Sequence, residues 1–196
     1  MRVIIFLMLL PGLIMGQGEQ KNAEGQSTDQ NGNSFEWIKY GDQYWSIENA
    51  EVETYRDGTI IPQVTDATEW SNLTTGAWCY IDNDSTKSRV YNWFAIAGIH
   101  DNDVNTPNKE FAPENWEVPS DAKWTMLENF LITNGYNYNG NTDIEAGEFL
   151  AKAMASTEGW NASNNSGSIG NQQQTNNTSG FNALPTGFRE PDGTFN

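Results

Sequence analysis

Residues 113–124 read Pro-Glu-Asn-Trp-Glu-Val-Pro-Ser-Asp-Ala-Lys-Trp and indicate a junction between an extended segment and a helix. Pro119 disfavours helical backbone at the residue before it, so we expect Val118 to be extended. Ser120 belongs to the residue types that cap helix N-termini, and Trp124 follows one turn later, on the face expected to point inward. The stretch is therefore predicted to organise folding rather than catalysis.

Two helices are predicted on either side of a Gly-rich turn. The first begins at Ser120, carries apolar residues on one face and ends at Gly135, a typical helix stop. The second begins at Thr142, which forms a capping-box pattern with Glu145, and continues to Met154. These two helices are the longest regular elements that we expect.

Short strands and long loops are predicted for the rest of the folded region. Gly41-Asp42 lies between aromatic and β-branched residues and predicts a hairpin, and Asp57-Gly58 predicts a second turn. Apolar runs follow at residues 77–80 and 90–95, although residues 90–96 are also compatible with a helix. Short strands combined with two helices predict an α+β domain.

The composition excludes one class of partner. The chain has 196 residues, which is the length of one domain, and its formal net charge is -16. Such a charge repels phosphate backbones, and the few Lys and Arg residues form no basic run, so nucleic acid is not an expected partner. The acidity is typical of a protein that must stay soluble outside the cell.

The N-terminal residues 1–16 are predicted to be a signal peptide. Arg2 supplies a positive charge, residues 3–15 are almost entirely apolar, and Gly16 offers a small residue before a cleavage point at Gln17. The apolar stretch is too short for a membrane span and is interrupted by Pro11. We therefore expect a secreted or cell-surface protein with no transmembrane segment after cleavage. Residues 17–33 have little to bury and are predicted to be a disordered linker.

Further segments in the folded region occur in a recognisable order. They are Trp45-Ser46-Ile47-Glu48-Asn49, Asp57-Gly58-Thr59-Ile60-Ile61-Pro62, Glu69-Trp70, Gly76-Ala77-Trp78-Cys79-Tyr80, Val90-Tyr91-Asn92-Trp93 and Gly180-Phe181-Asn182-Ala183-Leu184-Pro185. With residues 113–124, this series resembles the Fibrobacter succinogenes major paralogous (FISUMP) domain family over residues 37–196. The resemblance implies a compact C-type lectin-like domain over residues 34–196, related to formylglycine-generating enzymes.

The chain departs from this family at three places. Glu117 stands where the family commonly has His, and Phe111 stands where it often has a second Cys, so no role of those side chains is carried over. The family normally continues past the segment that matches residues 193–195. We therefore expect the domain to be truncated at its C-terminus, which would expose a sheet edge.

Cys79 is the only cysteine, so an intramolecular disulfide is impossible. A buried thiol, an intermolecular bond and a partner beyond the C-terminus all remain open. Formylglycine-type oxidation needs a pair of cysteines that bind copper, and this chain has no such pair. His100, the only histidine, has no Ser-His-Asp context, so we predict no catalytic residues and no enzyme activity.

Calcium is the only cofactor that the sequence suggests. Residues 101–105 begin like an EF-hand loop, but Thr106 replaces the turn glycine and Ala112 replaces the closing glutamate, so an EF-hand is rejected. Another kind of calcium site remains a weak prediction. Its candidate ligands are Asp82, Asp84, Asp101 and Asp103.

Aromatic residues are the remaining candidates for ligand binding. Trp45, Trp78, Trp93, Trp116 and Trp124 lie in the family segments and are predicted to be core. Tyr136, Tyr138 and Trp160 adjoin Asn- and Gly-rich segments, and we predict them at the surface, where they could stack on a ligand.

Three functional hypotheses follow from the sequence. The long polar connection 161–179 must be mobile, or be fixed by hydrogen bonds or a ligand, and is a second place to look for binding. The preferred hypothesis is a non-catalytic extracellular binding module for glycan or protein. A structural component of an exported complex is the alternative, and an enzyme is the third.

Overall fold

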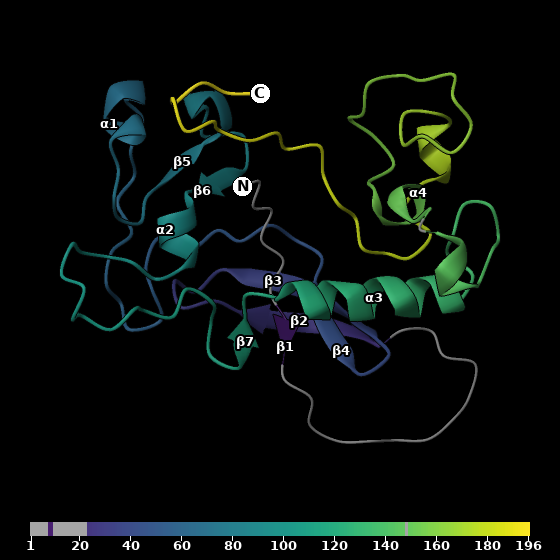
Figure 1. Ribbon diagram of the computed structural model, residues 1–196, viewed down its shortest axis with the longest axis horizontal. Coiled ribbons are helices and arrows are strands. Elements are labelled where there is room, and N and C mark those ends of the chain that lie inside the picture. Colours follow the sequence, from purple (N-terminus) through teal and green to yellow (C-terminus); the bar gives the residue numbers. More distant parts are fainter. Residues whose placement is uncertain (1–7, 10–22, 148) are drawn as a thin grey trace.

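The computed structural model describes residues 8–9, 23–147 and 149–196 and confirms the predicted α+β class (Figure 1). The strands are β1 (Met8–Leu9), β2 (Glu24–Thr28), β3 (Ser34–Tyr40), β4 (Gln43–Ser46), β5 (Trp78–Tyr80), β6 (Arg89–Tyr91) and β7 (Trp116–Glu117). The α-helices are α1 (Ala67–Ser71), α2 (Trp93–Ile96), α3 (Asp121–Thr133) and α4 (Ala151–Met154). Three short 3-10 turns are η1 (Ile81–Asn83), η2 (Ile144–Ala146) and η3 (Gln173–Thr175).

A five-stranded sheet in the order β2-β3-β4-β1-β7 forms one layer, and every pairing in it is antiparallel. The hairpin predicted at Gly41-Asp42 is confirmed, because β3 and β4 pair from Tyr40↔Gln43 outward and Gly41 has a φ of 59°. A separate two-stranded sheet joins β5 to β6 in the register Trp78↔Tyr91. Both sheets contribute buried residues to the apolar clusters of the core.

The helix α3 covers one face of the larger sheet, along which it runs in Figure 1. It contributes Leu127 and Leu131, both fully buried, and its Trp124 ring lies 4.6 Å from that of Trp45 on β4. The start and inward face of this helix were predicted correctly. Ser120 occupies the N-cap position, but its side chain makes no capping hydrogen bond, so the backbone and packing carry this helix start.

A second apolar cluster joins the start of β3 to the smaller sheet. Its buried members are Phe35, Ala50, Val52, Tyr55, Ile61, Trp78, Tyr91, Ala95, Phe111, Ala112 and Trp116. Phe111 belongs to this core and packs edge-on against Tyr91 at 5.0 Å. The guanidinium of Arg56 donates to the carbonyls of Ala112, Pro113 and Trp116 and ties this cluster to the strand-to-helix junction.

The predicted disorder of residues 17–33 is wrong for the described part of that range. Residues 24–28 form β2, which pairs with β3 over its whole length. The polar composition is compatible with a strand because backbone hydrogen bonds hold it, and Gly25 lets the Trp37 ring lie directly against its backbone. The prediction for residues 1–16 lies outside the described residues except for Met8–Leu9, which pair with β4 and β7.

The second predicted helix is wrong in extent. Residues 144–146 form only the turn η2, and α4 covers residues 151–154. Between them Gly147 has a φ of 102°, which ends the helical path, and the side chain of Asn137 accepts a hydrogen bond from the Phe149 amide. Asp143, not the predicted Thr142, caps η2.

Two further predictions concern residues 90–96 and the tryptophans. The ambiguity at residues 90–96 is resolved by Asn92, which ends β6 and caps α2 through a hydrogen bond from the Ala95 amide. Trp93, predicted to be core, is instead 47% exposed at the first position of α2. None of the helices in the described part of the chain is long and apolar enough to cross a bilayer.

Tyr55 and Tyr91 offer a test of the second cluster, because both phenols are buried but only one is hydrogen-bonded. Burial raises the pKa of Tyr55 to about 12 and raises the pKa of Tyr91 as well. The Tyr91 hydroxyl shares its single proton between the carbonyls of Val52 (2.8 Å) and Ala50 (3.2 Å). The Tyr55 hydroxyl finds no hydrogen-bond partner among the described residues.

The substitutions Tyr55→Phe and Tyr91→Phe are expected to change stability in opposite directions. Removing an unsatisfied hydroxyl should raise the free energy of unfolding by about 1 kcal/mol, while leaving two carbonyls unpaired should lower it by about 1.5 kcal/mol. Urea unfolding of the two variants measures both changes. Changes of the same sign would contradict the hydrogen-bond assignment.

Candidate binding site

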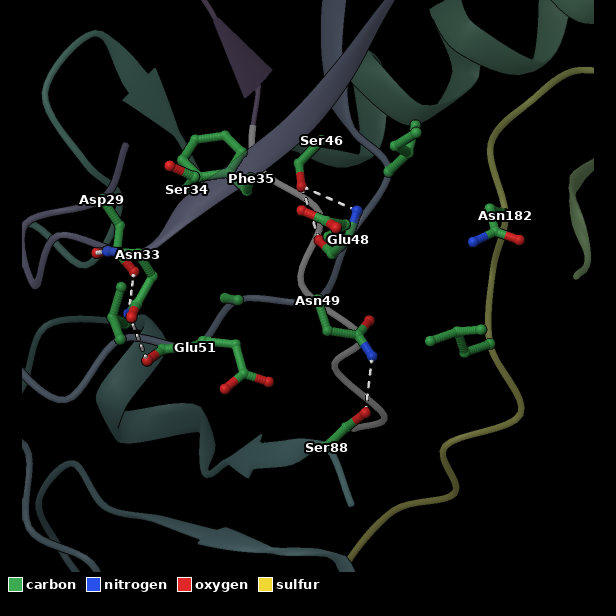
Figure 2. A pocket seen from close by; sticks show the side chains of 14 residues that line it. Asp29, Asn33, Ser34, Phe35, Ser46, Glu48, Asn49, Glu51, Ser88 and Asn182 are labelled. Carbon is green, nitrogen blue, oxygen red and sulfur yellow. Dashed lines mark hydrogen bonds between the residues drawn. The ribbon is translucent and has the colours of Figure 1, made fainter. Parts of the chain in front are cut away.

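A cavity of about 330 Å³ lies where the start of β3, the end of β4 and two loops meet a C-terminal segment (Figure 2). Its size is at the lower end of the range for small-molecule sites. Its lining comprises Asp29, Asn33, Ser34, Phe35, Ser46, Ile47, Glu48, Asn49, Ala50, Glu51, Val52, Ser88, Asn182 and Leu184. Polar side chains thus share the cavity lining with a substantial apolar surface.

The turn before β3 forms one end of the cavity. Asp29 accepts hydrogen bonds from the backbone amides of Asn31 (2.8 Å) and Asn33 (2.9 Å) and from the Asn33 side chain (2.9 Å). The side-chain amide of Asn33 also donates to the Glu51 carbonyl at 3.4 Å. Asp29 is therefore occupied in holding this turn, which brings Asn33 to the cavity.

The loop after β4 forms the longest wall. Ser46 donates to the carbonyl of Glu48 at 2.7 Å, and the carboxylate of Glu48 accepts the Glu36 amide at 2.8 Å through Oε2. Asn49 donates through its Nδ2 to the Ser88 hydroxyl at 3.2 Å. These contacts orient the Asn49 amide while its side-chain oxygen makes no hydrogen bond to the described residues.

The opposite wall comes from the C-terminal part of the chain, and in Figure 2 Asn182 lies across the cavity from Glu48 and Asn49. Asn182 has a left-handed backbone with a φ of 58°, a conformation that Asn tolerates well. Asn177 holds it by accepting its backbone amide (2.8 Å) and donating to its side-chain oxygen (3.3 Å). Leu184, which is 43% exposed, adds an apolar surface beside it.

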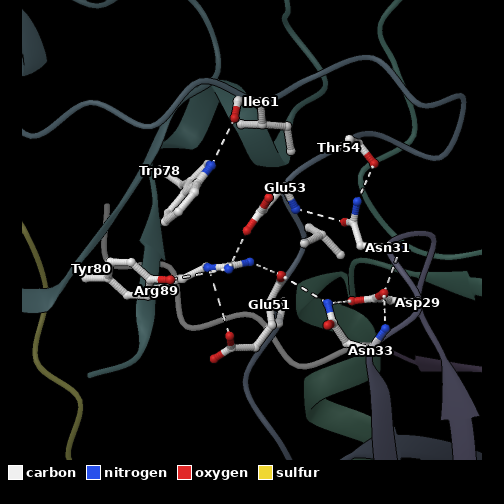
Figure 3. A network of polar contacts seen from close by, with 12 residues as sticks. Asp29, Asn31, Asn33, Glu51, Glu53, Thr54, Ile61, Trp78, Tyr80 and Arg89 are labelled. Atoms are coloured by element: carbon white, nitrogen blue, oxygen red, sulfur yellow. Dashed lines mark hydrogen bonds and ion pairs between the residues drawn. The ribbon is translucent and has the colours of Figure 1, made fainter. Parts of the chain in front are cut away.

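Arg89 contacts Glu51 and Glu53 through its guanidinium and helps to fix the position of Glu51 (Figure 3). Its guanidinium lies 4.4 Å from the centre of the Trp78 ring and donates to Glu53 at 2.6 Å and to the Glu51 carbonyl. Only 10% of its side chain is exposed, whereas 49% of the Glu51 side chain is exposed. Arg89 is thus a structural cation, not a ligand-facing one, and it lies outside the cavity lining.

The aromatic residues predicted to bind a ligand lie elsewhere. Tyr136 is half-buried and packs against the apolar cluster that contains Leu127 and Leu131 of α3. Tyr138 is 49% exposed, with its hydroxyl against Ser166. Trp160 is half-buried and donates its indole N–H to the Ser156 carbonyl at 3.1 Å. None of the three predicted residues lines the cavity.

The long polar connection 161–179 is fixed by hydrogen bonds, one of the alternatives left open by its sequence. The centre is Lys152, a buried residue of α4 whose ammonium donates to the carbonyl of Asn171 and to the side chain of Asn176 at 2.8 Å. The Asn176 amide in turn donates to the carbonyls of Ser156 (3.1 Å) and Ile169 (2.9 Å). The loop is therefore organised from its inside.

The aspartates suggested as calcium ligands are engaged locally. Asp82 pairs with Lys87 at 2.5 Å, and Asp101 lies 3.3 Å from His100. Hydrogen bonds from Thr86 lower the pKa of Asp84, and those from Asn105 lower the pKa of Asp103. In the part of the chain that the structure describes, no three His, Cys, Asp or Glu side chains gather as a metal site.

Cys79 is a buried free thiol, as one of the predicted alternatives required. It packs with Val64, Trp70 and Ala77, and this burial raises its pKa. The guanidinium of Arg189 acts in the opposite direction. The buried thiol belongs to the core and not to the candidate binding site.

Two segments that resemble the FISUMP family meet at the cavity, Trp45–Asn49 on one wall and Gly180–Pro185 on the other. A family model of the Fibrobacter succinogenes major domain matches residues 38–196. The chain belongs to this family. No curated protein and no solved structure matches this member of the family.

Sequence reasoning missed Asn33, Glu48, Asn49 and Asn182, although three of these four residues lie in the segments that indicated the family.

Proposed function

We propose that this Fibrobacter succinogenes major domain is an exported, non-catalytic binding module for glycan or protein, with the described cavity as its binding site. The observation that carries the proposal is the convergence of amide, hydroxyl and carboxylate groups around Phe35, Ile47 and Leu184. A few polar groups on a partly apolar, concave surface are typical of sites that bind small ligands or parts of larger ones.

The non-catalytic assignment rests on how the carboxylates are used. Asp29 holds the turn before β3, Glu48 receives the Glu36 amide, and Glu51 lies 3.9 Å from the Arg89 guanidinium. Each carboxylate therefore has a structural contact, and the only histidine, His100, lies outside the cavity lining. None of the four aspartates suggested as calcium ligands lines the cavity, so the proposed binding does not use that predicted calcium site.

Export is proposed from the apolar leader and the net charge of -16. A structural role in an exported complex is the alternative function, and it predicts contact through a broad surface instead of the cavity. Binding of a small probe inside the cavity would favour the module over that alternative.

The proposal is tested by titrating the full, nitrogen-15-labelled chain with cellotetraose, a glucosamine tetramer, tetragalacturonate and a lysine-containing tetrapeptide. We expect at least one probe to shift the NMR signals of the Asn33, Asn49 and Asn182 side-chain amides. The Asn182→Gly variant keeps the left-handed backbone but removes the amide, and should weaken binding about 5- to 10-fold.

The matched control is Gln172→Gly, since Gln172 is also left-handed, with a φ of 48°, but lies outside the cavity lining. This control variant should bind like the parent chain. Shifts confined to other surfaces would contradict the assignment of the site. Release of new reducing ends from a probe would show that the domain is an enzyme and would contradict the non-catalytic assignment.

A further inference from the structure

We infer that the cavity selects a carbohydrate carrying a free, protonated amine, an inference that rests on the proposed function. The first observation is the sign of its charge. Asp29, Glu48 and Glu51 line the cavity, and no Lys or Arg among the described residues belongs to its lining. The surrounding chain adds to the same field, with a formal net charge of -16.

The nearest cation does not cancel this charge inside the cavity. Arg89 is stacked on Trp78 and engaged by Glu53 and the Glu51 carbonyl, and it is only 10% exposed. Its Nε–H has no hydrogen-bond partner among the described residues, but that atom is buried and lies 3.9 Å from the Glu51 carboxylate, so it does not face a ligand in the cavity. An acidic sugar would meet like charges without a compensating partner, which makes its binding unfavourable.

Several hydrogen-bond acceptors in the cavity lining are not used by the fold. Glu48 uses one carboxylate oxygen for the Glu36 amide and keeps the other, and Glu51 is half-exposed. Asn49 donates an N–H to the Ser88 hydroxyl, and its side-chain oxygen is available to accept a hydrogen bond from a ligand. Asn33 donates its side-chain N–H groups to the Asp29 carboxylate and the Glu51 carbonyl, so these groups are not available to a ligand. A ligand that supplies hydrogen-bond donors can satisfy these acceptors.

A sugar fits these walls better than a lysine side chain does. The acceptors are distributed along the loop after β4, while Asn182 presents its amide from the opposite side (Figure 2). A pyranose ring has hydroxyl donors around its whole edge and C–H groups that can lie against Leu184 and Ile47. A lysine offers one ammonium at the end of a flexible stem. An amine on the ring adds a charge-assisted hydrogen bond to a carboxylate.

The experiment compares four probes on the full chain by calorimetry, with NMR to locate the site. These are a glucosamine tetramer, its N-acetylated form, tetragalacturonate and a lysine-containing tetrapeptide, at a pH where the amines are protonated. We expect the glucosamine tetramer to bind at least about 10-fold more tightly than the acetylated form and to weaken as salt is added. Tetragalacturonate should not bind the cavity.

The double variant Glu48→Gln/Glu51→Gln keeps an oxygen acceptor at each position and should remove the roughly 10-fold preference. The control Glu69→Gln removes an exposed carboxylate on α1, away from the cavity, and should leave the preference unchanged. A preference lost equally in both variants would show a general charge effect and overturn the inference.

The remaining outcomes separate this inference from the proposed function. Equal binding of acetylated and free-amine tetramers in the cavity overturns the amine preference and leaves the binding module standing. Tighter binding of the peptide overturns the choice of carbohydrate. If no probe shifts the cavity amides, both the inference and the assignment of the cavity are wrong.

Discussion

The Arg89→Met variant is expected to lose about 3 kcal/mol of unfolding free energy and its ligand binding at the cavity. Arg89 connects β6 to residues 51–53, because its guanidinium bonds Glu53 and the Glu51 carbonyl while lying on the Trp78 ring. Met fills a similar volume but provides no donor. The Glu53 carboxylate then loses its partner, and the Glu51 carbonyl keeps only the 3.4 Å contact with the Asn33 side chain, so Glu51 is held less firmly at the cavity wall.

Denaturant unfolding and the probe titration together measure this result. The variant Arg89→Lys should recover little of the loss, since an ammonium cannot stack flat on an indole ring and reach both acceptors. The control is Lys87→Met, because Lys87 forms an exposed pair with Asp82 and should contribute little to stability. Full stability in Arg89→Met would mean that residues 51–53 are held by other contacts.

The Gly98→Ala variant is expected to lose about 4 kcal/mol or to fail to fold. Gly98 follows α2 with a φ of 75°, and a Cβ there would lie 2.0 Å from the carbonyl oxygen of Lys109. The obstacle is backbone, and the Lys109 amide is itself bonded to the Gly98 carbonyl at 2.9 Å. Neither segment can move without breaking this contact.

Gly58→Ala is the matched control for this prediction. Gly58 has a φ of 85°, but none of the described atoms lies within 4 Å of the place where an alanine methyl would sit. Alanine there should therefore cost only about 1 kcal/mol of backbone strain. Thermal unfolding of both variants separates steric contact from strain. Similar losses in the two variants would show that the left-handed backbone alone determines the cost.

Local signals in the sequence predicted those elements that depend on local chemistry. The β3–β4 hairpin follows from Gly41-Asp42 between aromatic residues, and α3 follows from its apolar face and its end at Asn134-Gly135. The strand β2 was missed because its stability comes from pairing with β3, not from its own side chains. The second helix was overestimated because the left-handed Gly147 interrupts a pattern that is otherwise helical.

The candidate site was beyond sequence reasoning for a related reason. Its walls are far apart in the sequence, and the packing of Phe181 against Trp45 and Trp124 helps to bring Asn182 to the side of the cavity opposite Glu48. Tyr136, Tyr138 and Trp160 are residue types that commonly bind ligands, but none of them lines the cavity. Amide and carboxylate side chains line it together with apolar ones. The family segments located both walls without indicating that they meet.

Lys152 gives the Asn-rich connection a built-in counterpart of a structural ion. A positive centre surrounded by carbonyl and amide oxygens is the arrangement by which metals order polar loops, and here the centre is covalently attached to α4. The cation that orders this loop is part of the polypeptide and therefore cannot dissociate from it. We therefore expect that neither chelators nor changes in the concentration of metal ions alter the conformation of this loop.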